Sequence, residues 1–579
     1  MPKGALRIAI AQINPTVGDL RSNTSLILKH ITQARSAGAN IVAFPELAVT
    51  GYPPEDLLLK PHFVKENIEA CNEIAASTQN ITAVYGFIEM DTHLYNSAAI
   101  AHDGKIIATH RKYHLPNYGV FDEQRYFNPG TSCNVFTING VKVGINICED
   151  IWYPQEPISL QCAAGAAVIV NLNGSPFHIG KLKARENMLA ARSSENKVHI
   201  VYVNLVGGQD ELVFDGASVV FTSTGKILTR ANQFEEELLI FDLDCDTKIE
   251  LSNKEPAQSK YSREQEPEWS IAENIHVSNY SPNELPSIQT RKRPHYSGVE
   301  EVYRSLVLGT RDYVQKCGFN SVLVALSGGI DSSLVAAIAV DALGPGNVIG
   351  LSMPSAYSSK GSTTDTEGLA ENLHIRLETI PIQGIFDAMR DALTLQFKGT
   401  VSDTTEENMQ SRIRGDLVMS MSNKFGWLVL TTGNKSEMAV GYATIYGDMA
   451  GGFAVIKDVP KVMVYDLCKH INFRAGTEII PQSVIEKPPS AELKPDQKDS
   501  DTLPSYDILD PILEQYIERD KSYREIKDMG FDPETVKQII NLVDKSEYKR
   551  RQSPPGVKIT PKNFGRDRRM PISNRYKPF

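Results

Sequence analysis

The polar segment between residues 247 and 294 constrains the fold most, because it separates two series of short apolar runs. This segment contains five prolines and no sustained periodicity, which is typical of a boundary between domains. A chain of 579 residues is also too long for one hydrophobic core, since a domain usually holds about 100 to 200 residues. We therefore expect one domain at residues 1–245, a linker at 246–294 and a second domain at 295–579.

Both parts show the pattern of α/β domains. In the first part, runs such as LRIAIAQI, ITAVYGFI and AAVIVNLN are rich in β-branched residues, and helix-sized segments separate several of them. This predicts a layered α/β domain. In the second part, the runs SVLVALSGG, VIGLSMP and WLVLTTGN alternate with helical patterns such as DSSLVAAIAVDAL. This alternation predicts a doubly wound parallel sheet.

Charge, hydropathy and cysteine usage exclude several classes of protein. The net charge of -10 argues against nucleic acid as the main ligand, because binding to phosphate backbones needs a surplus of lysine and arginine. No apolar run reaches the roughly 20 residues of a membrane-spanning helix, and the N-terminus lacks the pattern of a secretion signal. The seven cysteines are scattered and form no C-x-x-C pair. We expect a cytoplasmic protein with reduced thiols that binds neither nucleic acid nor membranes.

A glutamate, a lysine and a cysteine follow three of the predicted strands in the first part: Glu46, Lys112 and Cys148. Strand ends of an α/β fold meet at one edge, so we expect these side chains to share a pocket. Cleavage of an amide needs a thiolate, a base and a cation that holds the oxyanion. Glu46 would be the base, and Lys112 would lower the pKa of the thiol and stabilise the oxyanion. Taken singly, a buried apolar cysteine and two surface charges are the plainer interpretation.

The surroundings of these three residues resemble the nitrilase, or carbon-nitrogen hydrolase, family over about the first 245 residues. The matching motifs are FPELAVTGYPPEDLL, RKYHLPNYGVFDEQRYF and GINICEDIW. The resemblance implies an α-β-β-α sandwich, a Glu-Lys-Cys triad, a thioester intermediate and the release of ammonia. It also implies that Glu123 orients the triad and that Tyr118, Ser175 and Lys181 contact glutamine. A loop serine and a surface cation remain the alternative interpretation of Ser175 and Lys181.

The motif SGGIDSS in the second part follows a predicted strand and begins a predicted helix. Gly328 and Gly329 allow backbone N–H groups to approach an anion, and the helix N-terminus adds about half a positive charge. No lysine follows the glycines as it would in a Walker motif, so transfer of the terminal phosphate is not expected. The motif favours a site for departing pyrophosphate. A plain tight turn is the alternative.

This motif resembles that of the N-type ATP pyrophosphatases, which activate an oxygen by adenylation and then replace AMP with a nitrogen nucleophile. The resemblance implies that Ser327, Ser332 and the glycine amides hold pyrophosphate. It also implies that Asp331 holds Mg²⁺, which prefers carboxylate oxygens and bridges phosphates.

The blocks EENMQSRIRGD, TTGNKSE, YGDMAGG and KDVPK are similar to those of the NAD synthetases, over most of residues 300–510. The resemblance implies that ATP and deamido-NAD are substrates and that the protein is at least a dimer, with the dinucleotide near the subunit interface. By matching position, the implied residues are Thr432 and Lys461 for ATP, Asn408, Arg412, Glu437 and Lys549 for deamido-NAD, and Asp331 with Glu437 for Mg²⁺.

Together the two parts predict ATP-dependent amidation of deamido-NAD by ammonia from glutamine. Because free ammonia is mostly protonated at neutral pH, we also expect a shielded passage between the sites. The alternatives are an amidotransferase that acts on another acceptor such as a nucleobase, an amidase with a nucleotide-sensing domain, and a scaffold with inactive sites. The basic C-terminal stretch after residue 546 is either a solvated surface or a source of cations for an anionic substrate.

Overall fold

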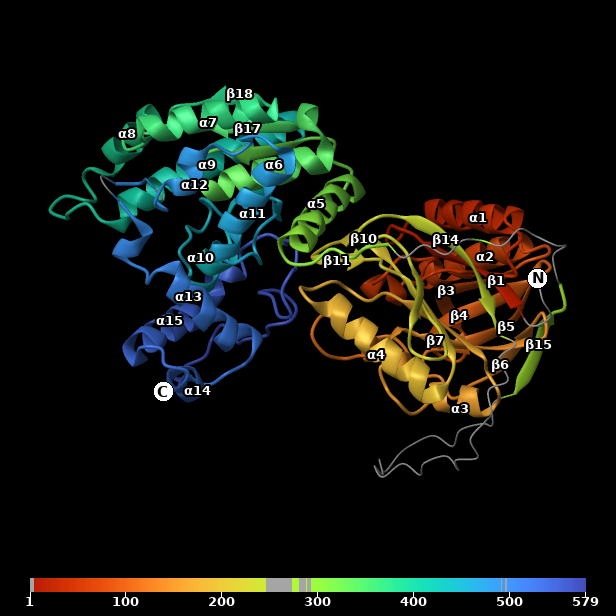
Figure 1. Cartoon of the computed structure of the whole chain (residues 1–579). Helices are drawn as coiled ribbons and strands as arrows, with labels where there is room; N and C mark the ends of the chain where they lie inside the picture. Colours follow the sequence, from red (N-terminus) through yellow and green to blue (C-terminus); the bar gives the residue numbers. More distant parts are fainter. Residues whose placement is uncertain (1–4, 246–272, 281–287, 289–292, 491, 495–496) are drawn as a thin grey trace. The chain divides into compact units, whose positions relative to one another are not determined.

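The computed structural model of the protein describes residues 5–245, 273–280, 288, 293–490, 492–494 and 497–579 (Figure 1). The chain forms two compact units, one from residues 1–209 and 214–296 and the other from residues 210–213 and 297–579. Most of the expected linker lies outside the described residues. Its strand β15 (Asn274–Ser278) pairs with β6 (Val135–Ile138) in the first unit.

Among the described residues, the first unit contains two large sheets. The first sheet has the strand order β14-β1-β2-β3-β4-β5, and the second has the order β13-β12-β9-β8-β7-β6-β15. The strands of the first sheet are β1 (Ala5–Gln12), β2 (Ile41–Ala43), β3 (Thr82–Met90), β4 (Leu94–His102), β5 (Lys105–Arg111) and β14 (Glu237–Asp244). The remaining strands are β7 (Val141–Ile147), β8 (Val168–Asn173), β9 (His199–Asn204), β12 (Val219–Phe221), β13 (Ile227–Arg230) and the hairpin β10 (Val206–Gln209) and β11 (Leu212–Asp215).

Alternation along β1 shows how the sheets are layered. Ile8 and Ile10 belong to a core shared with the second sheet, whereas Ala9 and Ala11 pack with residues of helix α1 (Leu20–Ser36). The helices are α1 and α2 (Pro61–Ala76) outside the first sheet and α3 (Ile158–Ala163) and α4 (Lys181–Asn196) outside the second (Figure 1). This is the α-β-β-α sandwich that the resemblance to the nitrilase family implies.

The second unit contains a parallel sheet of order β18-β17-β16-β19-β20 in the part of the chain described. Its strands are β16 (Val322–Ala325), β17 (Val348–Ser352), β18 (Arg376–Thr379), β19 (Leu428–Thr431) and β20 (Phe453–Ala454). The first strand, β16, lies between β17 and β19, so the direction of winding reverses beside it. In such sheets ligands bind beyond the carboxyl ends of the strands at this reversal. The predicted doubly wound sheet is confirmed.

Helices cover the sheet of the second unit and also form a small helical group. The helices around the sheet are α5 (Val299–Lys316), α6 (Ile330–Leu343), α7 (Lys360–Leu373), α8 (Gln383–Leu393), α9 (Thr404–Phe425), α11 (Lys461–Ala475) and α12 (Gln482–Glu486). The helical group has its own core and comprises α10 (Lys435–Val440), α13 (Tyr506–Leu513), α14 (Tyr523–Asp528), α15 (Pro533–Lys545) and α16 (Glu547–Arg550). None of the helices in the described residues has both the length and the apolar character to span a bilayer.

Candidate active sites

The three residues expected to cleave an amide come together in the first unit. Lys112 directly follows β5, Cys148 directly follows β7, and Glu46 lies shortly after β2. Lys112 Nζ donates a hydrogen bond of 2.6 Å to Glu46 Oε1, and both side chains are fully buried. Cys148 has a φ of 44°, a left-handed conformation that is uncommon for a residue other than glycine. This sharp turn between a strand and a short helix is typical of a nucleophile elbow.

Close packing fixes the carboxylate of Glu46. Its Oε1 accepts a hydrogen bond of 2.8 Å from Asn96 Nδ2, and its Oε2 accepts one of 2.8 Å from the backbone N–H of Gly174. A Cβ at Gly174 would lie 2.9 Å from the ring of Tyr52 and 3.2 Å from Glu46 Oε2. Glycine is therefore needed there for the backbone to approach the carboxylate.

Glu123 is a second carboxylate on the same lysine. Its Oε1 accepts hydrogen bonds of 2.8 Å from Lys112 Nζ and 2.8 Å from the Tyr52 hydroxyl. Burial raises the pKa of Glu123 to about 7; Lys112 opposes this shift and Glu46 adds to it. For Lys112, burial acts to lower the pKa, but Glu123 and Glu46 together raise it well above its ordinary value. The lysine is thus held as a cation between two carboxyl groups.

The pKa of the Cys148 thiol moves opposite to the expected direction. Burial raises it well above the ordinary value, Glu46 adds to the rise, and Lys112 only opposes it. Desolvation disfavours the thiolate more than one cation favours it, because two carboxylates share that cation. The resting thiol therefore keeps its proton, so a base must remove the proton when substrate is attacked.

Two of the three residues expected to contact glutamine, Tyr118 and Lys181, lie near the next residue, Glu149. Tyr118 donates from its hydroxyl to Glu149 Oε1 at 3.0 Å. Burial raises the pKa of Glu149, while Tyr118, Lys112 and Lys181 oppose the rise, which places the charge of Lys181 near this carboxylate. Ser175 is buried, and its N–H donates to Asn204 Oδ1 at 3.0 Å.

Two functional candidates in this unit were missed from sequence, Glu149 and Asp150. Asp150 is fully buried, and its carboxylate accepts hydrogen bonds from the N–H groups of Tyr113 at 3.1 Å, His114 at 2.8 Å and Ile147 at 3.0 Å. It thereby ties the segment after Lys112 to the strand end before the nucleophile. The adjacent acids in CEDIW were the available signal.

The second unit has a cavity of about 550 Å³ at the carboxyl ends of β16, β17 and β19. Of the residues expected to bind nucleotide or metal, those that line it are Ser327, Gly329, Asp331, Ser332, Asn408, Thr432, Glu437, Lys461 and Lys549. Two others are not brought to it. Gly328 does not line the cavity, and Arg412 Nε instead donates to the carbonyl of Ile445 at 3.3 Å.

The glycine turn has the geometry of an anion site. Gly328 has a φ of 74°, and a Cβ there would lie 2.4 Å from the carbonyl oxygen of Ser362, so only glycine fits. Helix α6 begins at Ile330 with Gly329 as its cap, and the hydroxyls of Ser327 and Ser332 lie 3.3 Å apart at this end. The positive end of the helix dipole and these hydroxyls together favour a phosphate group.

Two carboxylates flank one lysine in the same cavity. Lys461 Nζ pairs with Asp331 Oδ2 and lies 3.4 Å from Glu437 Oε1. Asn434 Nδ2 donates to Asp331 Oδ1 at 2.8 Å. Burial raises the pKa of Glu437 to about 8; Lys461 opposes this rise and Asp331 adds to it.

These oxygen donors fit a hard cation. Mg²⁺ is usually held by one or two carboxylates together with substrate phosphates and water, and Asp331 and Glu437 supply such a pair. Among the described residues, no group of three or more histidine, cysteine, aspartate or glutamate side chains could hold a metal ion without other ligands. Phosphate oxygens and water would therefore complete the coordination.

Two further residues expected to contact deamido-NAD, Lys549 and Asn408, also line this cavity. Lys549 Nζ donates to the carbonyls of Gly441 at 2.8 Å and Ala443 at 3.0 Å, and burial lowers its pKa. Asn408 Oδ1 accepts a hydrogen bond of 2.8 Å from the Thr444 hydroxyl. Two lining residues missed from sequence are Arg414 and Asp448, which lie within the matching blocks RIRGD and YGDMAGG.

At least two cations of the basic C-terminal stretch form internal pairs. Lys558 is buried and lies 2.6 Å from Asp567, and Arg568 lies 3.3 Å from Asp544. Neither lines the cavity. For these two residues, the solvated-surface interpretation is wrong.

The first unit is an α-β-β-α sandwich that carries a buried Glu-Lys-Cys set, and the second is a doubly wound sheet with a cavity at a glycine turn. Together they define a two-domain enzyme that cleaves an amide in one unit and carries out a nucleotide-dependent synthesis in the other. Residues 7–251 match the carbon-nitrogen hydrolase family, and residues 302–553 match the NAD synthase family. The chain belongs to the glutamine-dependent NAD(+) synthetases.

The relatives match along the full length of the chain. The glutamine-dependent NAD(+) synthetase of Thermotoga maritima is 47% identical over 575 residues, which cover 99% of each chain. That of Aquifex aeolicus is 46% identical and covers 99% of this chain and 100% of its own. The solved glutamine-dependent NAD+ synthetase from Acinetobacter baumannii in complex with ADP is 39% identical, with a TM-score of 0.73 and coverage of 99% and 100%.

Proposed function

We propose that the protein amidates deamido-NAD to NAD with ammonia released from L-glutamine, at the expense of ATP, which yields AMP and pyrophosphate. One observation carries this proposal. Each unit brings a complete set of reactive side chains together, Glu46, Lys112 and Cys148 in one, and Asp331, Glu437 and Lys461 in the other.

In the first unit, Glu46 accepts the thiol proton while Cys148 Sγ attacks the amide carbon of glutamine. Lys112 stabilises the oxyanion, and Glu46 returns its proton to the departing ammonia. The resulting thioester is hydrolysed by water that Glu46 activates, which releases glutamate. The carboxylate of Glu149, held by the Tyr118 hydroxyl, attracts the α-ammonium group of glutamine.

In the second unit, the carboxylate of deamido-NAD attacks the α-phosphorus of ATP. The glycine turn with Ser327 and Ser332 receives the departing pyrophosphate, and Lys461 lies where it can contact phosphate oxygens. Mg²⁺ held by Asp331 and Glu437 would neutralise the charge on the phosphates. Ammonia then displaces AMP from the adenylated carboxyl and forms the amide.

The two reactions depend on each other through ammonia. Because ammonium predominates at neutral pH and is not a nucleophile, we propose that ammonia passes to the second site before it equilibrates with solvent. We also propose that the enzyme works in the cytoplasm.

Exposed apolar side chains on two adjoining helices support the proposal of a homo-oligomer, at least a dimer. Ile385 and Met389 on α8, and Met419 and Phe425 on the adjoining α9, are all exposed. Exposed apolar clusters on a soluble enzyme mark interaction sites, and we propose a second copy of this chain as the partner. Sedimentation of the wild type and of an Ile385→Glu, Phe425→Glu variant tests this. Unchanged mass in the variant would contradict it.

An isotope experiment tests the reaction. The protein is incubated with ATP, Mg²⁺, deamido-NAD and amide-¹⁵N glutamine, and NAD and the adenine nucleotides are analysed. We expect ¹⁵N in NAD and one AMP per NAD. Unlabelled NAD, or ADP in place of AMP, would contradict the mechanism. As a control, Cys148→Ala should lose glutamine-dependent synthesis and keep synthesis with ammonium salts.

A further inference from the structure

A buried lysine, Lys435, lies beside residues of the second site but does not line its cavity. It is two residues before Glu437 in the TTGNKSE block. Its Nζ lies 2.9 Å from Asp458 Oδ1 and 2.7 Å from Glu518 Oε1, and it donates to the Thr560 hydroxyl at 2.7 Å. A lysine so completely paired in the interior fixes the groups around it.

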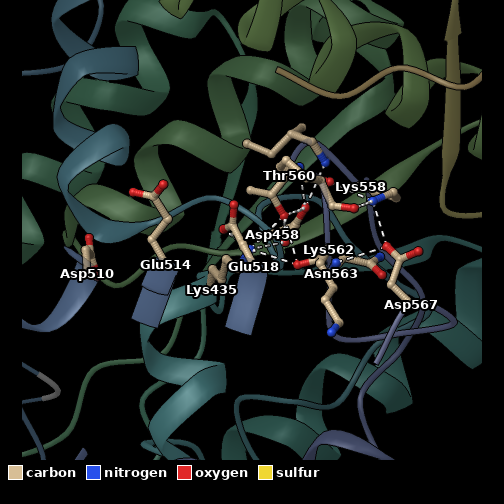
Figure 2. A network of polar contacts seen from close by, with 12 residues as sticks. Lys435, Asp458, Asp510, Glu514, Glu518, Lys558, Thr560, Lys562, Asn563 and Asp567 are labelled. Carbon is tan, nitrogen blue, oxygen red and sulfur yellow. Dashed lines mark hydrogen bonds and ion pairs between the residues drawn. The ribbon is translucent and has the colours of Figure 1, made fainter. Parts of the chain in front are cut away.

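The main partner of this lysine, Asp458, is three residues before Lys461 in the KDVPK block. Asp458 is buried, and its carboxylate accepts from the backbone N–H groups of Ile559 at 2.8 Å and Thr560 at 2.7 Å. The Thr560 hydroxyl also donates to Asp458, at 2.8 Å to Oδ2. The segment around Thr560 therefore holds this carboxylate together with the lysine (Figure 2).

The chain around this pair also joins the starts of α10 and α11. The N–H of Lys435 donates to the carbonyl of Val459 at 2.9 Å, and the N–H of Lys461 donates to the Ser436 hydroxyl at 2.9 Å. These two helix starts carry Glu437 and Lys461, whose side chains meet at the cavity. A displacement of Asp458 must therefore move Lys461 relative to Glu437.

We infer that Asp458 is a positioning residue for Lys461, held in place by Lys435 and by Thr560 of the C-terminal segment. The inference rests on the proposed role of Lys461 as a phosphate contact. The segment lies beyond residue 553, where the match to the NAD synthase family ends. The segment after residue 553 thus serves the ATP site through Asp458.

The inference is tested by substituting two buried acids of the same unit, one beside Lys435 and one elsewhere. Asp458→Asn removes the charge next to Lys435, and the matched control Asp567→Asn removes the buried partner of Lys558. Thr560→Val removes the hydroxyl between Lys435 and Asp458, whereas Thr560→Ser keeps it. For each variant of the full chain, we measure melting temperature, glutaminase activity and the deamido-NAD-dependent exchange of pyrophosphate into ATP.

We expect Asp458→Asn to lower kcat/KM for ATP roughly tenfold or more, since it removes hydrogen bonds to a charged group. Thr560→Val should also lower kcat/KM for ATP, whereas Thr560→Ser should keep most of the wild-type value. Asp567→Asn should lower the melting temperature but leave kcat/KM for ATP within about twofold. If Asp458→Asn does not fold, the Thr560 pair still decides. Equal ATP kinetics in Thr560→Val and wild type would overturn the inference.

A double-mutant cycle with Lys461→Met separates positioning from general support. If Asp458 acts through Lys461, Asp458→Asn adds little to the defect of Lys461→Met. Fully additive defects would overturn the positioning role alone. A Lys461→Met variant with normal ATP kinetics would instead contradict the proposed function of the site.

Discussion

Lys112 Nζ lies 2.6 Å from Glu46 Oε1, and neither side chain is exposed to solvent. Lys112 also lies 2.8 Å from Glu123, so one cation compensates two buried carboxyl groups. Removing one partner of a buried ion pair leaves an uncompensated charge, which costs about 3 to 5 kcal/mol. The catalytic set is therefore also a determinant of the stability of the first unit.

Mutation can separate the role of this ion pair in catalysis from its role in stability. Lys112→Met should abolish glutaminase activity and lower the free energy of unfolding by about 3 kcal/mol or more. Cys148→Ala should abolish the same activity with little change in stability, because it removes only one sulfur. Urea unfolding and glutamate release measure both. If Lys112→Met unfolded at the same urea concentration as Cys148→Ala, the ion pair would not contribute to stability.

The raised pKa of Glu437 predicts a pH dependence of the second unit. Because its pKa is about 8 in the fold and near 4.5 when unfolded, the folded protein binds the extra proton between these values. Without Mg²⁺, this group therefore makes the protein less stable as pH rises from about 4.5 to 8, and no further change follows above that range.

Mg²⁺ should reverse this trend, because the ion and the proton compete for the carboxylate. We expect affinity for Mg²⁺ to weaken as pH falls below about 8, by up to tenfold per pH unit. Melting temperatures in EDTA and in Mg²⁺ between pH 5.5 and 8.5 measure the effect. Glu437→Gln should remove it, and a wild-type response identical to that of Glu437→Gln would contradict the assignment.

The hydroxyl of Tyr118 predicts a change confined to glutamine use. Tyr118→Phe removes a hydrogen bond to the Glu149 carboxylate, worth about 1.5 to 3 kcal/mol for a charged acceptor. We expect KM for glutamine to rise roughly tenfold while ammonium-dependent synthesis stays unchanged. The control is Tyr126→Phe, whose hydroxyl donates to the exposed Asp56 at 2.6 Å. Equal losses with glutamine and ammonium would place Tyr118 outside substrate binding.

The sequence predicted the parts of the fold that depend on local pattern. Lys112 and Cys148 each follow a strand that is a short apolar run in the sequence, and SGGIDSS joins a strand to a helix. Periodicity and turn chemistry were therefore sufficient to predict these elements. Strand β14 could not be placed in this way. It pairs antiparallel with β1, which is more than 200 residues earlier in the chain, and no local signal records that pairing.

Buried charges were the least predictable part of the sites. Asp150 reads as an ordinary acid, yet it binds N–H groups of Tyr113 and His114, which are 37 and 36 residues away. Likewise Lys558 lies in a basic stretch that looks solvated, but its partner Asp567 is folded back against it. The charge pattern of a sequence shows which residues are able to form ion pairs. Which of them need a partner depends on burial, and burial is decided by the tertiary fold.

Gly328 offers a test of whether the shape of the phosphate turn limits activity. A Cβ at this position would require a left-handed backbone, at about 1 to 2 kcal/mol, and would lie 2.4 Å from a backbone oxygen of Ser362. Since backbone cannot rotate away as a side chain can, Gly328→Ala should destabilise the second unit and prevent synthesis with ammonium. Glutamate release should remain.

Two other glycines of the second unit supply the controls. Gly329 has an extended backbone, and an added Cβ would meet only the Ser327 hydroxyl at 3.2 Å, so Gly329→Ala should keep near-normal stability. Gly346→Ala meets nothing within 4 Å and should keep both stability and activity. Melting curves and ammonium-dependent NAD formation distinguish the three. A Gly328→Ala variant as stable as Gly329→Ala would show that the Ser362 backbone yields, and the turn would then not require glycine.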